Sequence, residues 1–267
     1  MDIGQNDNGE LRILPLPPPT GKSRPRGDQG TPDETVPTDA TGSTFDISAY
    51  LRENMVSVGP GNNQMKLEVL KIPVTQEFYH AYKSEKKFSV DNPLFPADGI
   101  CWQDAIEFCN WVSEKDNKDP CYTKYEDEQT GKSYWTCDDS KNGYRLPKKT
   151  EWFFVAQGGI AKSNFKFSGS SNIGKVAWYN GNSKGCLQEV EKKEPNKLGL
   201  YDLSGNVWEF CWDRYDCSAD RIACGGSAQS TEGLCEIHPE NVEHFKEGEP
   251  RPFVGFRLFR YNLSKEN

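Results

Sequence analysis

Residues 199–210 read Gly199-Leu200-Tyr201-Asp202-Leu203-Ser204-Gly205-Asn206-Val207-Trp208-Glu209-Phe210. We expect Leu200 and Leu203 to be buried anchors, and Ser204-Gly205-Asn206 has the composition of a turn whose glycine can adopt a positive φ. Val207 to Phe210 predict the start of a strand. Glu209 then lies between aromatic neighbours, so its carboxylate needs a partner: a structural cation, an arginine or backbone N–H groups.

Length and composition limit the class of protein. The chain has 267 residues, of which 35% are hydrophobic and 12% aromatic, which favours an irregular, loop-rich globule over a regular helical bundle. The formal net charge is −8 and no basic cluster occurs, so we expect no nucleic-acid partner. No run approaches the roughly 18 apolar residues of a membrane span. We therefore expect membrane association only through a lipid anchor or a leader outside this sequence.

The cysteine pattern argues against a zinc site, because the nine cysteines include no Cys-x-x-Cys and there are only three histidines. Most of the thiols are predicted to be small buried side chains, and an odd count leaves at least one unpaired. Cys121 and Cys137 flank the turn 129–132 almost symmetrically. This spacing predicts a hairpin across which the two cysteines would face each other.

The chain divides by composition into two parts. Residues 1–44 contain seven prolines among small and polar residues, which predicts a flexible tether or arm. Residues 45–267 are predicted to form one domain. Its expected elements are strands at 55–58, 66–72, 221–227 and 253–259, and helices at 76–82, 102–115 and 150–157, with Thr75 as an N-cap and a long loop region after Gly158-Gly159. This is an α+β pattern with small sheets and two or three helices.

Several motifs occur in one order along residues 50 to 260. They are Pro73-Val74-Thr75, Cys101 to Ala105 with Cys109-Asn110-Trp111, Tyr144-Arg145-Leu146-Pro147 with Glu151-Trp152, Leu198 to Phe210, Gly225-Gly226-Ser227 and Gly255-Phe256-Arg257. Together they resemble the formylglycine-generating-enzyme/sulfatase-modifying-factor family, which implies a variant of the C-type lectin fold. One departure is Lys148, where family members carry a threonine cap. Here Thr150 is expected to cap a helix that starts later.

The resemblance also bears on catalysis. Family oxidases use a cysteine pair shortly after Gly-Gly-Ser, and one of the two is needed to hold copper. This chain has Cys235 at one spacing and Ser230 at the other, and a serine cannot supply a thiolate to a soft copper site. We therefore expect no enzyme activity. The alternatives are an oxidase whose second cysteine is supplied unconventionally and a catalytically dead scaffold.

Residues 228–250 lack periodicity and lie between two patterned strands, which is typical of a binding segment. The layout resembles the variable ligand-binding proteins of diversity-generating retroelements, which implies a lipoprotein at the bacterial cell surface, a protein or other macromolecular ligand, and a variable segment at about 208–257. Six glutamates in this segment favour a basic partner. The predicted ligand-binding residues are Phe210, Trp212, Asp213, Tyr215, Ala228, Gln229, Ser230, Glu232, His238, Glu240, Asn241, Glu243, His244 and Phe245.

Two expectations concern metal ions. The resemblance implies a structural calcium at Glu209 with the carbonyl groups of Gly205 and Val207, and the alternative is a buried, hydrogen-bonded Glu209. Glu194-Pro195-Asn196 looks like the family's lead-in to the following motif, so calcium-dependent sugar binding is not expected. No other cofactor is required.

Overall fold

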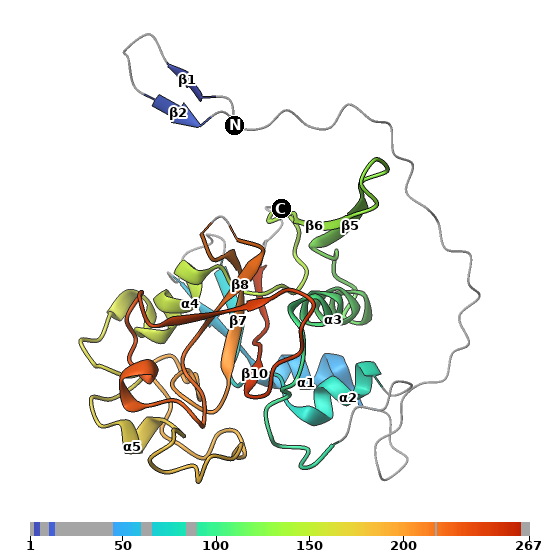
Figure 1. The fold of residues 1–267 in the computed structure, drawn as a ribbon. Coiled ribbons are helices and arrows are strands. Elements are labelled where there is room, and N and C mark those ends of the chain that lie inside the picture. Colours follow the sequence, from blue (N-terminus) through green and yellow to red (C-terminus); the bar gives the residue numbers. More distant parts are fainter. Residues whose placement is uncertain are drawn as a thin grey trace. The chain divides into compact units, whose positions relative to one another are not determined.

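The computed structural model describes residues 3–5, 11–13, 45–59, 66–83, 90–216 and 218–262 (Figure 1). The chain divides into two units, Met1–Thr35 and Val36–Asn267. In the first unit β1 (Ile3–Gln5) pairs antiparallel with β2 (Leu11–Ile13). The rest of the predicted tether at 1–44 lies outside the described residues.

A three-stranded antiparallel sheet joins the start and the end of the second unit. Its order is β11 (Phe259–Asn262), β4 (Lys66–Leu70), β3 (Met55–Val58), and α1 (Ile47–Asn54) leads directly into β3. The strands predicted near 55–58 and 66–72 are confirmed. The strand predicted at 253–259 is instead split, because residues 256–258 cross between two sheets and only β10 (Val254–Gly255) and β11 form ladders.

The helices follow the predicted pattern closely. They are α2 (Gln76–Lys83), α3 (Trp102–Lys115), α4 (Lys149–Ala156) and the short α5 (Ile173–Val176), with 3₁₀ turns η1 (Gly159–Ala161) and η2 (Glu232–Cys235). The Phe78 amide donates to Thr75 Oγ1 over 3.3 Å, so Thr75 caps α2 as expected. Together with α1, which the sequence did not predict, the described residues contain more helices than the two or three expected.

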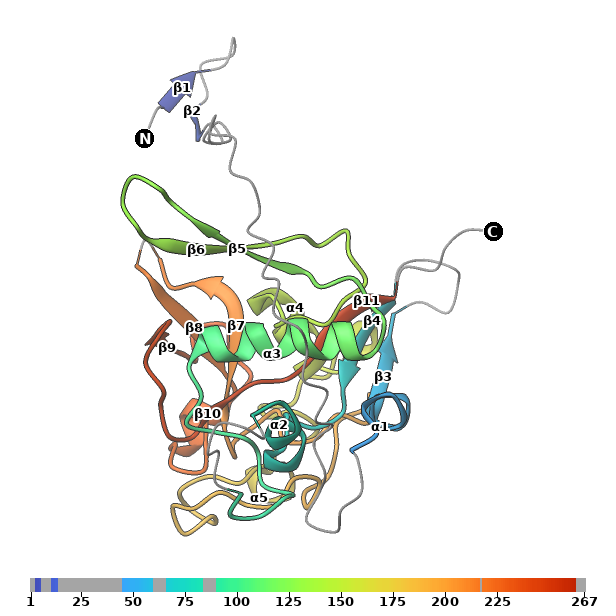
Figure 2. The same ribbon diagram turned by 90° about the vertical axis from the view of Figure 1, so that its right-hand side faces the viewer.

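The C-terminal third forms a four-stranded sheet in the order β10, β7 (Trp208–Arg214), β8 (Asp220–Cys224), β9 (Val242–Lys246), and Figure 2 labels all four strands. β7, β8 and β9 are antiparallel neighbours, and β10 runs parallel to β7. The sheet contributes to two core clusters: Phe210 and Ala223 join one, and Cys211 and Cys224 join the other. Both faces of the β7–β8 pair are therefore buried.

The predicted hairpin is present as β5 (Tyr122–Glu126) and β6 (Ser133–Cys137), on the same side of the domain as α3 (Figure 2). Its register places Tyr122, not Cys121, opposite Cys137, and both cysteines are free thiols. The expectation that the two cysteines face each other is therefore wrong. In antiparallel pairing a shift of one residue moves a side chain to the other face of the hairpin.

No helix among the described residues has the length and apolar character needed to span a bilayer.

Candidate functional site

The Glu209 carboxylate is fully buried and forms an ion pair with Arg257, which we call the buried ion pair. Arg257 Nη2 lies 2.6 Å from Glu209 Oε1, and Arg257 Nε lies 3.0 Å from Oε2. Trp152 Nε1 donates to Oε2 over 2.8 Å. Arg257 also donates to the carbonyl oxygens of Leu70 and Tyr201. Its side chain therefore links the segments that contain Leu70, Tyr201 and Arg257 itself to Glu209 on β7. Of the three partners expected for Glu209, the structure has the arginine.

The geometry around Glu209 does not fit the calcium ion that the resemblance implies. Both carboxylate oxygens already accept hydrogen bonds, and the partner that neutralises the charge of Glu209 is the Arg257 guanidinium group, which a calcium ion would have to displace. Within the described part of the chain, no three Cys, His, Asp or Glu side chains are grouped so that they could hold a metal ion. The alternative, a hydrogen-bonded glutamate, describes the contacts of Glu209.

Asp202 is a buried carboxylate that the sequence analysis did not single out. Its backbone has φ +57°, and its Oδ2 accepts from the Glu191 amide over 2.9 Å. Its Oδ1 has no hydrogen-bond partner among the described residues. Burial raises the pKa of Asp202 to about 6. The sequence does contain a signal for this site, because Asp202 is a charged residue between Leu200 and Leu203, both of which were expected to be buried.

The position of the oxidase cysteine pair is occupied by groups that cannot form a thiolate pair. Ser230 is buried, and its Oγ accepts from the Ser227 amide over 2.9 Å. Cys235 is also buried, and burial raises the pKa of its thiol to about 12. A Cβ added at Gly226 would come within 2.6 Å of Cys235 Sγ, so the sulfur lies directly against the Gly-Gly-Ser turn. The cysteine is part of the core.

An exposed cluster, which we call the ribbon tip, consists of Tyr215, Asp220 and His244. Tyr215 directly follows β7, and its ring stacks on that of His244 with centroids 4.1 Å apart and an interplanar angle of 11°. His244 Nδ1 lies 2.9 Å from Asp220 Oδ2. Tyr215 is 37% exposed and the His244 side chain 41%. This arrangement presents a rigid aromatic pair to solvent.

The base of the ribbon tip is held by packed side chains. The Arg221 guanidinium lies 3.6 Å from the ring centre of Trp102 and 5.0 Å from that of Trp212, and its Nη2 is 2.8 Å from Glu247 Oε1. Trp212 also packs against Tyr122. Trp212, predicted to bind a ligand, is therefore half-buried and supports the tip.

The second group of predicted residues lies on residues 229–241, which we call the η2 loop. Gln229, Glu232, His238 and Glu240 are exposed, and half-buried Asn241 donates to the Gly233 carbonyl over 2.8 Å. The η2 loop leads into β9, whose first residue Val242 pairs with Cys224, whereas Asp220 of the ribbon tip lies at the other end of β8. The predicted site is thus divided between two ends of one strand pair.

Four predicted ligand-binding residues serve the fold. Phe210 and Ala228 are fully buried and Ser230 nearly so, so their side chains do not reach the surface. Asp213 Oδ2 accepts from the Lys149 amide over 2.6 Å, which caps the start of α4. The remaining residues, Glu243 and Phe245, are half-buried on β9, and the Phe245 ring packs edge-on against Phe210.

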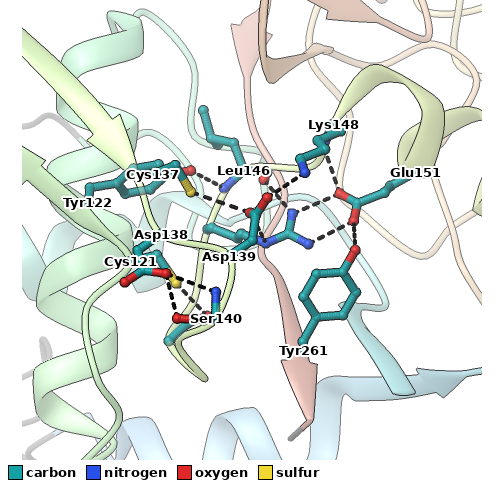
Figure 3. A network of polar contacts seen from close by, with 12 residues as sticks. Cys121, Tyr122, Cys137, Asp138, Asp139, Ser140, Leu146, Lys148, Glu151 and Tyr261 are labelled. Carbon is teal, nitrogen blue, oxygen red and sulfur yellow. Dashed lines mark hydrogen bonds and ion pairs between the residues drawn. The ribbon is translucent and has the colours of Figure 1, made fainter. Parts of the chain in front are cut away.

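The start of α4 also corrects the cap expected at Thr150. The helix begins at Lys149, and the Lys148 amide donates to Glu151 Oε2 over 2.8 Å (Figure 3). Arg145 holds the same carboxylate through two hydrogen bonds of 2.7 Å, and Tyr261 donates to it from β11. Burial raises the pKa of Glu151, but Arg145 outweighs it and the net shift is downward. The carboxylates of Glu151 and Asp213 thus accept hydrogen bonds from the amides at the start of α4, where a threonine cap was expected.

Comparison of the sequence with known proteins identifies the family of this chain. The family model described as "Sulfatase-modifying factor enzyme 1-like domain" matches residues 64–262. The chain is 33% identical over 198 residues to "Chaperone protein LppX" of Paenibacillus barcinonensis, covering 62% of this chain and 71% of that protein. It is 24% identical over 172 residues to the formylglycine-generating enzyme of Thermomonospora curvata, which covers 58% of this chain but only 47% of the enzyme.

The solved structure of Treponema denticola variable protein 1 superposes with a TM-score of 0.64 at 26% identity, covering 77% of this chain and 94% of that one. The α+β architecture with small sheets is that of this group of C-type-lectin-fold proteins. The chain therefore belongs to the sulfatase-modifying-factor family.

Proposed function

We propose that the chain is a non-catalytic binding protein that presents its C-terminal ribbon to a protein or other macromolecular partner outside the cytoplasm, at a bacterial cell surface. The likeness to a variable protein and to a protein named as a chaperone supports binding. In this proposal the variable segment is about 208–257, as in the variable proteins of diversity-generating retroelements.

The observation that carries the proposal is the ribbon tip. Tyr215 and His244 form an exposed stack, and the groups beneath it are fixed by Arg221 and Trp212. Rigid aromatic side chains provide contact area at a low cost in conformational entropy, which is why binding surfaces use them. The stack is therefore suited to recognition without a conformational change of the strands.

The charge of the surface indicates the chemistry of the partner. Glu236, Glu247 and Glu249 are paired with Lys or Arg side chains. Glu232, Glu240 and Glu243 form no ion pair with any residue that the structure describes. Glu232 and Glu240 lie on the η2 loop, and Glu243 lies on β9 next to His244 in sequence. Unpaired carboxylates on the C-terminal ribbon favour a partner with a basic patch, since complementary charge speeds association and selects the partner.

The oxidase alternative is disfavoured by the contacts of Ser230 and Cys235. Copper(I) prefers thiolate ligands, and this position offers a buried serine and one buried thiol in place of two cysteines. We expect no copper-dependent oxygen consumption with a thiol-containing peptide, measured with an oxygen electrode. Turnover that depends on Cys235 would contradict the proposal.

The binding experiment compares two exposed aromatic stacks. The Tyr215→Ala/His244→Ala variant removes the ribbon tip, and the matched control, Tyr125→Ala/Tyr134→Ala, removes the stacked pair on the β5–β6 hairpin. The proteins retained by the immobilised full chain and by each of the two variants are quantified by mass spectrometry. Binding is then confirmed with the purified partner. We expect the tip variant alone to lose the partner. Equal retention by both variants would refute the ribbon tip as the site.

Sequencing the locus in several isolates tests diversification separately. We expect substitutions at exposed positions such as Tyr215, Gln229, Glu232 and His244, with Phe210, Ala228 and Ser230 unchanged because they are buried. Uniform drift along the domain would contradict a variable segment at 208–257.

A further inference from the structure

Two thiols with no place in the binding surface lie in contact inside the ribbon. Cys211 Sγ and Cys224 Sγ are 3.8 Å apart, and both residues have no exposed surface. Cys211 belongs to β7 and Cys224 to the neighbouring strand β8. Both are free thiols in this structure.

The strand pairing brings these side chains together. Cys224 is directly opposite Glu209, and Cys211 is two residues further along β7, where the register between the strands shifts. Side chains two residues apart on a strand point to the same face. Both sulfurs therefore project into the core cluster that also contains Trp152 and Leu203.

Cys109, Cys137 and Cys235 have different surroundings. Cys109 is buried in the cluster formed around α3, and Cys137 packs against that cluster from β6. Cys235 packs with Phe167 and Ile173 in a third cluster. Cys211 and Cys224 thus have each other as the neighbouring thiol within their own cluster, in contact across one strand pair.

We propose that Cys211 and Cys224 form a disulfide when the chain folds in an oxidising environment, with an organic disulfide as the oxidant. A disulfide needs a sulfur–sulfur distance of about 2.05 Å, so each sulfur has to move by about 0.9 Å toward the other. An oxidising compartment of this kind is what the proposed location outside the cytoplasm would supply. The assignment itself does not depend on what the ribbon tip binds.

The reaction is thiol–disulfide exchange. The thiolate of one cysteine attacks the organic disulfide, forming a mixed disulfide and releasing one small thiol; the second cysteine thiolate then attacks the protein sulfur of the mixed disulfide and releases the other small thiol. The protein loses two S–H bonds and gains one S–S bond, and the oxidant is reduced to two thiols. Once the cluster has closed, burial raises the pKa of Cys211 well above its usual value, so the exchange belongs to folding.

The bond would have a structural consequence for the ribbon tip. Residues 212–223, which include Tyr215 and Asp220, lie between the two cysteines along the chain. A disulfide would close this segment into a covalent loop directly beneath the exposed stack. Such a cross-link restricts the unfolded chain and holds the register of β7 on β8.

The test is a peptide map of the full chain. Protein is unfolded and reduced, then refolded either with a mixture of reduced and oxidised glutathione or with reductant alone, alkylated in guanidinium and digested with trypsin. We expect peptide 198–214 linked to peptide 222–246 after refolding with oxidised glutathione, and absent with reductant alone. Because peptide 222–246 also contains Cys235, fragment spectra must place the link at Cys224.

The controls are single substitutions. Cys211→Ser should abolish the linked peptide, whereas Cys109→Ser, at an equally buried thiol, should leave it unchanged. Recovery of both Cys211 and Cys224 in alkylated form after oxidative refolding would overturn the proposal, as would a link from either one to another cysteine. If a variant does not fold or the refolding fails, the wild-type chain is instead exported to an oxidising bacterial periplasm. The peptide map of that protein then shows whether Cys211 and Cys224 are linked. No ligand is involved, so the outcome is separate from that of the binding experiment.

Discussion

The two ends of strand β7 differ in almost every physical respect. At Glu209 a carboxylate, a guanidinium and an indole N–H are buried together, and both carboxylate oxygens are satisfied. Just beyond the other end, Tyr215 and His244 are stacked in solvent. One strand therefore carries a rigid anchor and an exposed surface.

This contrast separates stability from recognition. A buried charge pair is costly to disturb because a lone buried charge has no water to replace its partner. Exposed side chains can change with little effect on folding. The ribbon tip can therefore vary in sequence as long as the buried ion pair holds β7 in place.

Replacing Arg257 should have the largest effect, because it leaves Glu209 charged and buried without its partner. We expect Arg257→Met to lower the free energy of unfolding by about 3–5 kcal/mol in urea titrations. The double variant Glu209→Gln/Arg257→Met should lose less free energy of unfolding than Arg257→Met, because no unpaired charge is left in the core. A Lys246→Met control, which breaks an ion pair exposed to solvent, should leave the urea midpoint unchanged. If Arg257→Met and Lys246→Met have the same midpoint, the buried ion pair does not anchor β7.

Gly205→Ala tests the turn that precedes the buried ion pair. Gly205 has φ +79°, and an added Cβ would meet the Trp178 carbonyl oxygen at 2.1 Å. The backbone conformation alone costs about 1–3 kcal/mol for an L-residue, and the clash adds to it. Thermal and urea unfolding should both show the loss. The matched control is Gly233→Ala, where nothing lies within 4 Å of the new Cβ; equal stability of the two variants would contradict the turn's role.

Asp202→Asn should alter the pH dependence of stability. The folded pKa of about 6 lies above the unfolded value of 3.8, so the stabilising effect of protonation is complete below about pH 4 and is lost as the pH rises through 6. At pH 7 the asparagine variant should therefore be more stable than the wild type by about 1–3 kcal/mol. Urea titrations between pH 4 and 7 measure the difference, which should shrink toward pH 4. A difference independent of pH would exclude titration of Asp202 as its cause.

The ribbon tip should give the smallest stability effect. Tyr215→Ala and His244→Ala should each change the free energy of unfolding by no more than about 0.5 kcal/mol, because both side chains are exposed. Trp212→Ala should cost clearly more, since Trp212 packs between Trp102, Tyr122 and Arg221. Urea midpoints of the three variants test this order. A large loss in Tyr215→Ala would mean that the tip is part of the folding core.

Local patterns in the sequence predicted much of the fold. The 3.6-residue spacing of Ala105, Ile106, Cys109 and Val112 identified the buried face of α3, and alternation identified β3 and β4. Leu200 and Leu203 are buried as expected. These features depend on neighbours within a few residues, so one sequence contains the information.

The candidate site was predicted less completely, because burial of its residues depends on distant partners. Asp213 serves as a cap for α4, which lies far away in sequence, and Ser230 turns inward to bond Ser227. The composition of residues 208–257 identified the segment but could not separate residues facing solvent from residues facing the core.

The sequence by itself determined the family motifs, the turn at Gly205, the strand that begins at Trp208 and the need for a partner at Glu209. Only the tertiary structure decided which partner it is: Arg257 is 48 residues away along the chain and reaches Glu209 because β10, just before it, runs beside β7. The same packing joined Tyr215 to His244 and Cys211 to Cys224. The physical reason is that periodicity and turn chemistry act between near neighbours, whereas ion pairs, ring stacks and sulfur contacts depend on how distant segments are packed together.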